Sequence, residues 1–251
     1  MKEETDNGAS MKGLIAAIQF ITIFPFGKSA PFDPKKMVPF FPAVGLLLGI
    51  LVAVFDQAAL RLWSPPVAAL LDVILLIIMT GAFHLDGLGD TADGLLGQRS
   101  KEAALAIMKD SCLGTMGLVA IVCGLAIKWV GIMGLENHRS LLLIIIPAYA
   151  RGGMIFGIQY LEYGRPGGGT GLDFFKEKMG ISAFWGLLLL LILSLFLGWR
   201  AMLLNAGFAA IIAIILFYYK RRVGCITGDM LGAMAEVTES GLFLLISMGG
   251  V

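Results

Sequence analysis

Three aspartates in this chain stand at a spacing that suits a metal ion. Asp86, Asp90 and Asp93 are four and three residues apart, and no Lys or Arg lies between His84 and Gly94. On a helix these three positions fall within about 60° of one another. Two carboxylates ~6 Å apart repel each other by roughly 3 kcal/mol at an effective dielectric constant near 20. A divalent cation relieves this repulsion, and all-oxygen ligands favour Mg²⁺, Mn²⁺ or Ca²⁺.

A second set of acids opens the last apolar window of the chain. Asp229 and Glu236 are seven residues apart, and Glu239 follows three residues later. We expect Asp229 and Glu236 to complete the metal site or to hold a second ion. A simple helix cap by Asp229 is the alternative, but it does not account for Glu236, because an acid inside a membrane helix is functional by default. For the first motif the alternative is a solvated acidic helix end, which explains three neighbouring acids poorly.

Further polar residues near these acids are candidates for substrate contacts. His84 fits three roles, as a general base, a metal neighbour or a hydrogen-bonded structural histidine, and the sequence leaves all three open. Basic and glycine-rich segments together can cradle phosphate. The preference of Lys and Arg for cytoplasmic loops explains the same basic residues equally well. The predicted substrate-binding residues are Arg99, Lys109, Asp110, Arg165 and Thr227.

Composition indicates that these residues belong to a membrane protein. Of the 251 residues 58% are hydrophobic, the mean hydropathy is +0.86, and only 15% are charged, against roughly 25% in a soluble domain. Membrane lipid is therefore the expected surrounding. The net charge of +1 gives no pull toward nucleic acid, which we exclude as a partner. The three cysteines show no ligand spacing, so neither a disulfide framework nor a zinc site is indicated.

The apolar windows predict an all-α, polytopic fold with about seven transmembrane helices in a single domain, residues 1–251. Each window approaches the ~20 residues that a tilted helix needs to cross the bilayer. An earlier apolar run, residues 13–26, is shorter, and we expect it to form an interfacial or half-inserted helix. The seven windows are 38–60, 66–85, 114–134, 141–161, 181–199, 202–219 and 230–250.

The distribution of positive charge predicts the orientation. Segments 27–37, 89–113, 162–180 and 220–229 hold three Lys or Arg each, twelve together, whereas the alternate loops hold only three. Lys and Arg mark the cytoplasmic side of a membrane protein. The acidic motifs lie at the same level as the basic loops, so we expect the site to face the cytoplasm.

At this point the motifs resemble a known family, the adenosylcobinamide-GDP ribazoletransferases, also called cobalamin synthases. The resemblance runs in order over nearly the whole chain, and the first acidic motif is its most specific part. The matching motifs are His84-x-Asp86-Gly87-x-x-Asp90-x-x-Asp93-Gly94, Met108-Lys109-Asp110-Ser111 with Gly114 and Gly117, and Thr227-Gly228-Asp229-x-x-Gly232-Ala233 with Glu236; Gln19-Phe20-Ile21-Thr22 and Pro42-x-x-Gly45-x-x-x-Gly49 also look similar.

The resemblance implies a Mg²⁺-dependent transfer in the cell (inner) membrane. Adenosylcobinamide phosphate would pass from adenosylcobinamide-GDP to α-ribazole or its 5′-phosphate, with release of GMP. Mg²⁺ on Asp86, Asp90 and Asp93 would bind the pyrophosphate, and the 5′-hydroxyl of ribazole would attack. The proton would pass to His84 or to a carboxylate. The resemblance leaves room for a homo-oligomer and for association with other cobalamin-assembly enzymes.

Two other classes compete with this interpretation. A CDP-alcohol phosphatidyltransferase also carries Asp-rich helices at the membrane face, but Asp90-Thr91 stand where that family's motif has Ala-Arg. A cation-coupled transporter would use the acids as an ion path. The acids here gather at one predicted face, however, and the chain shows no repeated halves.

Overall fold

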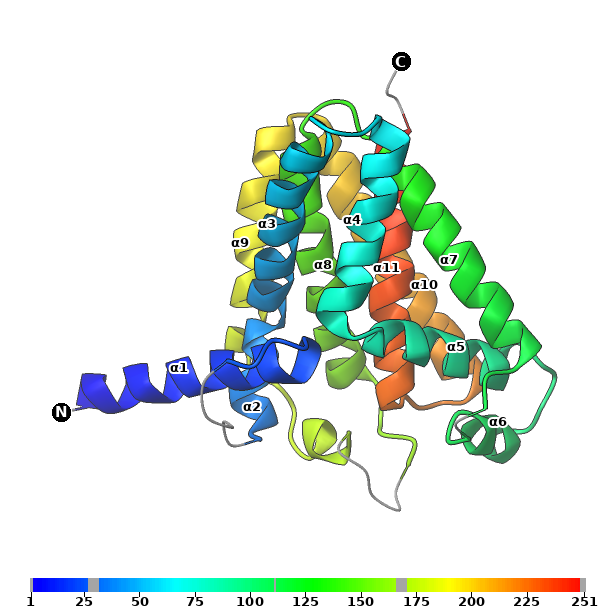
Figure 1. Ribbon diagram of the computed structural model, residues 1–251. Helices are drawn as coiled ribbons and strands as arrows, with labels where there is room; N and C mark the ends of the chain where they lie inside the picture. The colour runs from blue at the N-terminus through cyan, green and yellow to red at the C-terminus, as the bar shows by residue number, and fades with distance from the viewer. Residues whose placement is uncertain (1, 27–31, 111, 166–170, 249–251) are drawn as a thin grey trace.

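The computed structural model is an α-helical bundle (Figure 1), and it describes residues 2–26, 32–110, 112–165 and 171–248. Its elements, in chain order, are α1 (Lys2–Ile21), α2 (Pro34–Met37), η1 (Val38–Phe40), α3 (Phe41–Ala59), α4 (Pro65–Thr80), α5 (Phe83–Leu95), α6 (Lys101–Ile107), α7 (Thr115–Met133), α8 (Arg139–Tyr160), η2 (Leu172–Phe175), η3 (Ile181–Phe184), α9 (Trp185–Ser194), η4 (Leu195–Leu197), α10 (Arg200–Arg222) and α11 (Gly228–Ser247).

The long helices stand side by side, while two others lie across one end of the bundle. In Figure 1, α1 and α5 run across its lower end, whereas the long helices stand upright. Helix α11 lies inside and contacts α5, α7, α8 and α10. The position of α1 agrees with an interfacial helix for the first apolar run.

Five helices in the described part of the chain are long and apolar enough to cross a membrane: residues 34–59, α7, α8, α10 and α11. The pair α4 and α5 would add a sixth span if the two helices were counted as one broken span. They are bent by 91° relative to each other. The apolar segment 181–197 is shorter than a usual span. The prediction of an all-α polytopic membrane protein is therefore confirmed, with five to six spans by these criteria against about seven expected.

The bend between α4 and α5 sets the direction of the acidic helix. Gly81 and Ala82 both have a φ of 59°, in the left-handed region, so the α4 hydrogen-bond ladder stops at Thr80. Glycine adopts this conformation freely, whereas for alanine it is strained. The apolar window 66–85 therefore does not form one straight span, and its last residues begin a second helix that runs across the bundle end.

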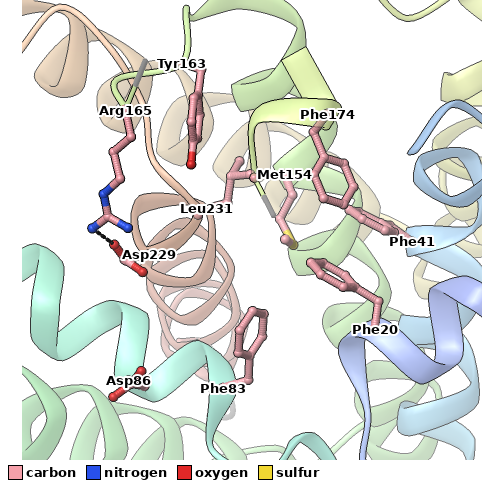
Figure 2. A pocket seen from close by; sticks show the side chains of 12 residues that line it. Phe20, Phe41, Phe83, Asp86, Met154, Tyr163, Arg165, Phe174, Asp229 and Leu231 are labelled. Atoms are coloured by element: carbon pink, nitrogen blue, oxygen red, sulfur yellow. Dashed lines mark hydrogen bonds and ion pairs between the residues drawn. The ribbon is translucent and has the colours of Figure 1, made fainter. Parts of the chain in front are cut away.

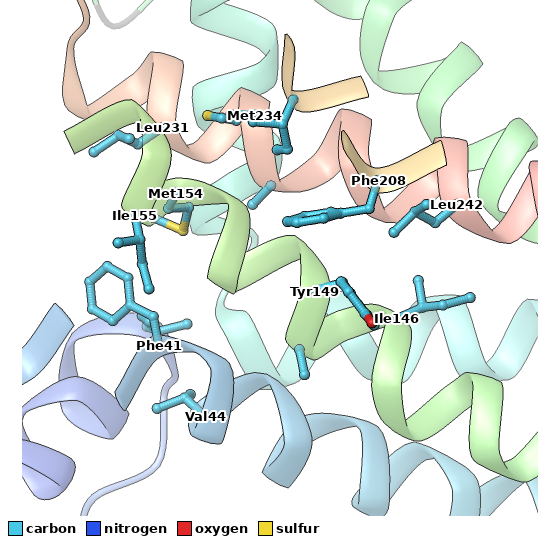
Figure 3. Packing of buried hydrophobic residues seen from close by; sticks show 14 of the residues in the cluster. Phe41, Val44, Ile146, Tyr149, Met154, Ile155, Phe208, Leu231, Met234 and Leu242 are labelled. Atoms are coloured by element: carbon cyan, nitrogen blue, oxygen red, sulfur yellow. The ribbon is translucent and has the colours of Figure 1, made fainter. Parts of the chain in front are cut away.

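Buried apolar side chains from α3, α8, α10 and α11 form the core of the bundle. Figure 3 shows Phe41 of α3 near Ile155 of α8, and Phe208 of α10 beside Leu242 of α11. The polar end of Tyr149 is satisfied within this core, because its hydroxyl donates to Asn205 Oδ1 at 2.6 Å. This packing fixes the frame on which the lower end is built.

Helices α3 and α8 approach each other through glycines. A Cβ built on Gly45 would lie 2.5 Å from the Pro147 carbonyl oxygen, and one on Gly49 would lie 2.6 Å from Ile144 Cα. Real Cβ atoms are essentially never this close to backbone. Small residues four apart allow membrane helices to pack with their backbones in contact, so the motif Gly45-x-x-x-Gly49 has a structural role.

Gly49→Ala is accordingly expected to destabilise the bundle. The added methyl group must push α3 away from the α8 backbone, and overpacking of this kind costs about 1–3 kcal/mol. Thermal unfolding in detergent measures the loss. Gly180→Ala is the control, because the nearest atom to its Cβ would be the Ser182 hydroxyl at 3.6 Å. Equal melting temperatures for the two variants would contradict this packing.

An ion-pair cluster ties α3, α4 and α8 at the bundle end opposite α5. The Arg139 guanidinium donates to Asp56 at 2.7 and 2.9 Å, to Asp72 at 3.3 Å, and to the Ile132 carbonyl at 2.6 Å. Both carboxylates are fully buried. Charges removed from water are stable only when they are paired and hydrogen-bonded, so this cluster explains why acids occur in the α3 and α4 spans.

Candidate active site

The three aspartates of the first motif occupy the open face of α5. All of residues 84–95 are described, and Asp86, Asp90 and Asp93 are the members of that stretch that are not buried. The remaining side chains pack into the bundle. The spacing of four and three residues thus does place the three carboxylates on one side of a helix, as expected.

Helix α5 packs directly against the start of α11. A Cβ on Gly87 would lie 2.6 Å from the Asp229 carbonyl oxygen, and one on Gly232 would lie 3.3 Å from His84 Cα. The two backbones therefore meet with no side chain between them. As a result Asp229 joins the α5 acids, since Asp86 and Asp90 are both close enough to it to interact electrostatically.

Asp229 is held in place by two neighbours. Arg165 donates to its Oδ2 atom at 2.7 Å (Figure 2) and also to the Met108 carbonyl at 2.8 Å. The Thr227 hydroxyl donates to the same Oδ2 atom at 3.3 Å and accepts from the Met230 amide, which caps α11. Thr227 is fully buried. In this position Thr227 orients Asp229, and its predicted substrate contact stays a prediction.

A short backbone pairing carries Arg165 to this place. The Gly164 amide donates to the Ile226 carbonyl, and the Ile226 amide donates to the Glu162 carbonyl, both at 2.9 Å. These bonds pair Tyr163 with Ile226 in parallel, so the segment after α8 runs beside the segment before α11. Burial raises the pKa of Tyr163, which keeps its hydroxyl neutral and able to donate a hydrogen bond.

Asp93 differs from the other α5 acids because it binds the start of α7. Its two carboxylate oxygens accept from the Gly114 amide at 2.7 Å and from the Gly117 amide at 2.9 Å. A negative charge at a helix N-terminus is favourable. A Cβ on Gly117 would lie 2.8 Å from the Gly89 carbonyl oxygen, so this glycine lets α7 meet α5 closely.

Asp93→Asn therefore tests a structural role apart from any metal. The amide can accept one of the two bonds but points its NH₂ group at the other backbone donor, which costs about 1.5–3 kcal/mol. We expect a lower melting temperature than wild type in EDTA. Asp90→Asn is the matched control, because it relieves repulsion and should be neutral or stabilising. If both substitutions behaved alike, Asp93 would not anchor α7.

Glu236 is not part of the acidic group at the bundle end. It pairs with Lys128 at 2.6 Å, and Lys128 also meets Glu239 at 2.7 Å. Glu239 forms a further ion pair with Arg151, and all four side chains are buried. Seven residues of helix put Glu236 about 10 Å along the axis from Asp229. Our placement of Glu236 among the metal ligands therefore has no support in the geometry.

His84 lies beside this buried ionic cluster and not in the cavity. Its side chain has no exposed surface, and Glu236 is one of its electrostatic neighbours. Neither ring nitrogen has a hydrogen-bond partner among the described residues. Of the three roles that the sequence leaves open for His84, this position does not favour the general base, because a general base must reach the proton that it removes.

Lys128→Met should destabilise the protein strongly. It leaves Glu236 and Glu239 buried with one base, Arg151, between them, and an uncompensated buried charge costs about 3–5 kcal/mol. We expect the melting temperature in detergent to fall by about 10 °C. The double variant Lys128→Met/Glu236→Gln restores charge balance and should recover most of the loss. A single variant as stable as wild type would refute the pairing.

Three predicted substrate-binding residues lie around the site but do not line its cavity. Arg99 donates to the Asp93 carbonyl at 3.0 Å, Asp110 accepts from the Cys112 amide at 3.3 Å, and Lys109 is exposed. Sequence inspection missed Arg222, which donates to the carbonyls of Leu95, Gly97 and Arg99. Arg222 thereby fixes the loop that leaves α5.

The acids face a cavity of about 150 Å³ that has one charged and one aromatic side (Figure 2). Asp86, Arg165 and Asp229 lie on the first side, and four phenylalanines lie on the second. The lining residues are Phe20, Phe41, Phe83, Asp86, Met154, Tyr163, Arg165, Gly171, Phe174, Gly228, Asp229 and Leu231.

The carboxylate oxygens at this site are of the chemical type that binds a hard divalent cation. Carboxylate oxygens are the preferred ligands of Mg²⁺, and Asp86 and Asp90 form no ion pair with any described residue. Asp90 has Asp86, Asp93 and Asp229 as electrostatic neighbours, with Arg165 as the opposing charge. Within the described ranges, however, no group of three or more His, Cys, Asp or Glu side chains is already arranged to hold a metal. Mg²⁺ therefore stays a prediction.

The fold and this site together define a polytopic helical membrane protein with an acidic, arginine-containing cavity at one bundle end. Comparison with known proteins is more specific. Residues 13–247 match the family model described as cobalamin-5-phosphate synthase. The chain belongs to this family, and not to either alternative class considered from the sequence.

Individual relatives agree with the family match. Relatives named adenosylcobinamide-GDP ribazoletransferase are 34% identical in Alkaliphilus metalliredigens, 34% in Chlorobium phaeovibrioides and 30% in Chlorobaculum tepidum. Each alignment covers 95% of this chain and 96–97% of the relative. No solved structure is significantly similar to the chain.

Proposed function

We propose that this protein transfers adenosylcobinamide phosphate from adenosylcobinamide-GDP to α-ribazole or α-ribazole 5′-phosphate, releases GMP, and requires Mg²⁺. The supporting observation is a match over nearly the full length of the family combined with the meeting of Asp86, Asp229 and Arg165 at one cavity. Acids that attract a divalent cation beside a basic group that binds phosphate suit a diphosphate substrate.

Asp86, Asp90 and Asp229 are the residues that would hold Mg²⁺ in this scheme. They bear carboxylates from two helices, and Asp86 and Asp229 line the cavity. Asp93 lies next to them, and its two oxygens accept the backbone bonds that fix α7 against α5. Each oxygen keeps a further lone pair for a metal ion, so Asp93 stays among the predicted ligands. When bound, Mg²⁺ would neutralise the diphosphate and the charge that develops on the leaving GMP.

Arg165 and Tyr163 supply the other phosphate contacts. The guanidinium is oriented by Asp229 and by the Met108 carbonyl, so it reaches the cavity without a large loss of side-chain freedom on binding. A preorganised donor is worth more than a mobile one, because charge in the transition state is stabilised without reorganisation. The neutral Tyr163 hydroxyl is a second donor on the same cavity.

The reaction needs a ribose hydroxyl, a phosphorus atom and a leaving GMP in one line. A bond forms between the hydroxyl oxygen and the phosphorus attached to cobinamide, and the bond from that phosphorus to the bridging oxygen breaks. The bridging oxygen leaves with GMP. The hydroxyl proton passes to a carboxylate oxygen, for which Asp86 is placed on the cavity. The 5′-phosphorylated acceptor has no free 5′-hydroxyl. We therefore assign the attack on phosphorus to a ring hydroxyl of the ribose, and not to the 5′-hydroxyl that we expected from the sequence.

The cavity would face the cytoplasm of a cell with this protein in its inner membrane. The described parts of the four segments rich in Lys and Arg, 27–37, 89–113, 162–180 and 220–229, lie at the α5 end of the bundle (Figure 1). Positive charge in short loops marks the cytoplasmic side.

GMP release by the purified protein, given adenosylcobinamide-GDP and α-ribazole, tests this function. We expect EDTA to abolish release and added Mg²⁺ to restore it. Asp86→Asn, Asp90→Asn and Asp229→Asn should each lower turnover by about a hundredfold or more, as loss of a transition-state contact does. Asp173→Asn is the matched control, because Asp173 is partly exposed, is paired with Lys176 and does not line the cavity.

The outcomes separate the two parts of the proposal. Full turnover in EDTA would exclude the metal while leaving the transfer intact. No GMP release with both substrates and Mg²⁺ present would exclude the transfer itself. Near-normal turnover in all three Asn variants would show that the reaction takes place elsewhere.

A further inference from the structure

The aromatic side of the cavity is built by four separate segments of the chain. Phe20 comes from α1, Phe41 from α3, Phe83 from α5 and Phe174 from η2. Phe20 lies at the centre, with ring centroids 5.2 Å from Phe174, 5.8 Å from Phe83 and 6.5 Å from Phe41. Figure 2 shows the four rings gathered across the cavity from Asp229 and Arg165.

Two of these four rings remain partly exposed. Phe41 and Phe174 are buried, whereas Phe83 is 46% exposed and Phe20 is partly exposed. The partly exposed rings of Phe20 and Phe83 therefore lie in the cavity lining beside two buried rings. Together they offer a flat apolar surface to a ligand. The adjoining lining residues, Met154 and Leu231, are also apolar.

We infer that this aromatic wall, Phe20, Phe41, Phe83 and Phe174, binds the planar base of the ribazole acceptor. The inference rests on the proposed function and extends it by assigning the acceptor's place. A ribazole has two unlike ends, a benzimidazole base that is flat and mostly apolar, and a ribose that carries hydroxyls. The cavity has the same division, with aromatic rings on one side and Asp86, Asp229 and Arg165 on the other.

The other two large groups in the reaction fit this wall less well. Guanine carries hydrogen-bond donors and acceptors along its edges, and leaving them unpaired against phenyl rings costs about 1–3 kcal/mol for each buried group. The corrin ring carries amide groups around its edge, and phenyl rings cannot hydrogen-bond them. A benzimidazole presents few polar edge atoms and can stack on phenyl rings.

This placement also orients the nucleophile. With the base against the phenylalanines, the attached ribose points across the cavity toward the acids and Arg165. The hydroxyl that attacks phosphorus would then arrive from the aromatic side, opposite the leaving GMP. Holding the two reactants in this order is the main contribution that a protein makes to phosphoryl transfer.

The test measures binding of α-ribazole alone, by equilibrium dialysis with detergent-solubilised protein, together with steady-state kinetics. Phe20→Leu and Phe83→Leu keep an apolar side chain but remove the flat ring. Because stacking of one base is worth a factor of about ten or more, each variant should raise Kd and KM for α-ribazole at least ~10-fold. KM for adenosylcobinamide-GDP should not change.

Phe156→Leu is the control, because Phe156 packs against Phe184 at 5.3 Å and does not line the cavity. Free dimethylbenzimidazole should displace α-ribazole from the wild-type protein, and guanosine should not. Unchanged α-ribazole binding in both Leu variants, or a rise in KM for adenosylcobinamide-GDP instead, would overturn the inference. Wild-type protein that binds α-ribazole but releases no GMP would instead overturn the proposed function.

Discussion

The backbone contact between α5 and the first turn of α11 is the constraint on which the site depends. Gly87 and Gly232 allow the two helices to meet without an intervening side chain, and this brings Asp229 to Asp86 and Asp90. Like charges repel, so these carboxylates come together only because packing elsewhere forces the helices to cross there. The bend at Gly81 and Ala82, which lays α5 across the bundle end, is part of the same constraint.

The acids of this protein divide according to whether a base is available to them. Glu236 and Glu239 lie deep in the bundle with Lys128 and Arg151, so their charges are balanced and their role is to hold α7, α8 and α11 together. Near the surface, Arg165 is the base beside Asp86, Asp90 and Asp229. A surplus of negative charge remains there, and a cation or a cation-bearing substrate is what such a surplus attracts.

Sequence inspection predicted the fold class, the interfacial first helix and the shared face of Asp86, Asp90 and Asp93, because each depends on local periodicity. It did not predict the 91° bend between α4 and α5, because hydropathy does not report the direction of a helix and Phe83 and Leu85 continue the apolar run. It did not predict the ion pair of Glu236 with Lys128, because this partner is 108 residues away; the placement of Glu236 among the metal ligands stays a prediction. Lys128 and Arg151 inside spans were the available signal, since buried bases need buried acids. The aromatic wall could not be assembled from the sequence, because its rings come from four distant segments and only Phe20 lay in a motif noted there, Gln19-Phe20-Ile21-Thr22.

The pairing of Tyr163 with Ile226 restricts how this family can vary in length. Surface loops usually tolerate insertions and deletions. Here the segments after α8 and before α11 share a backbone register, and moving either by one residue turns its side chains to the opposite side. An insertion of one residue between 163 and 165 would turn Arg165 away from Asp229, although no helix would be altered. Length changes in homologues should therefore occur after Arg165, beyond the paired residues 162–164.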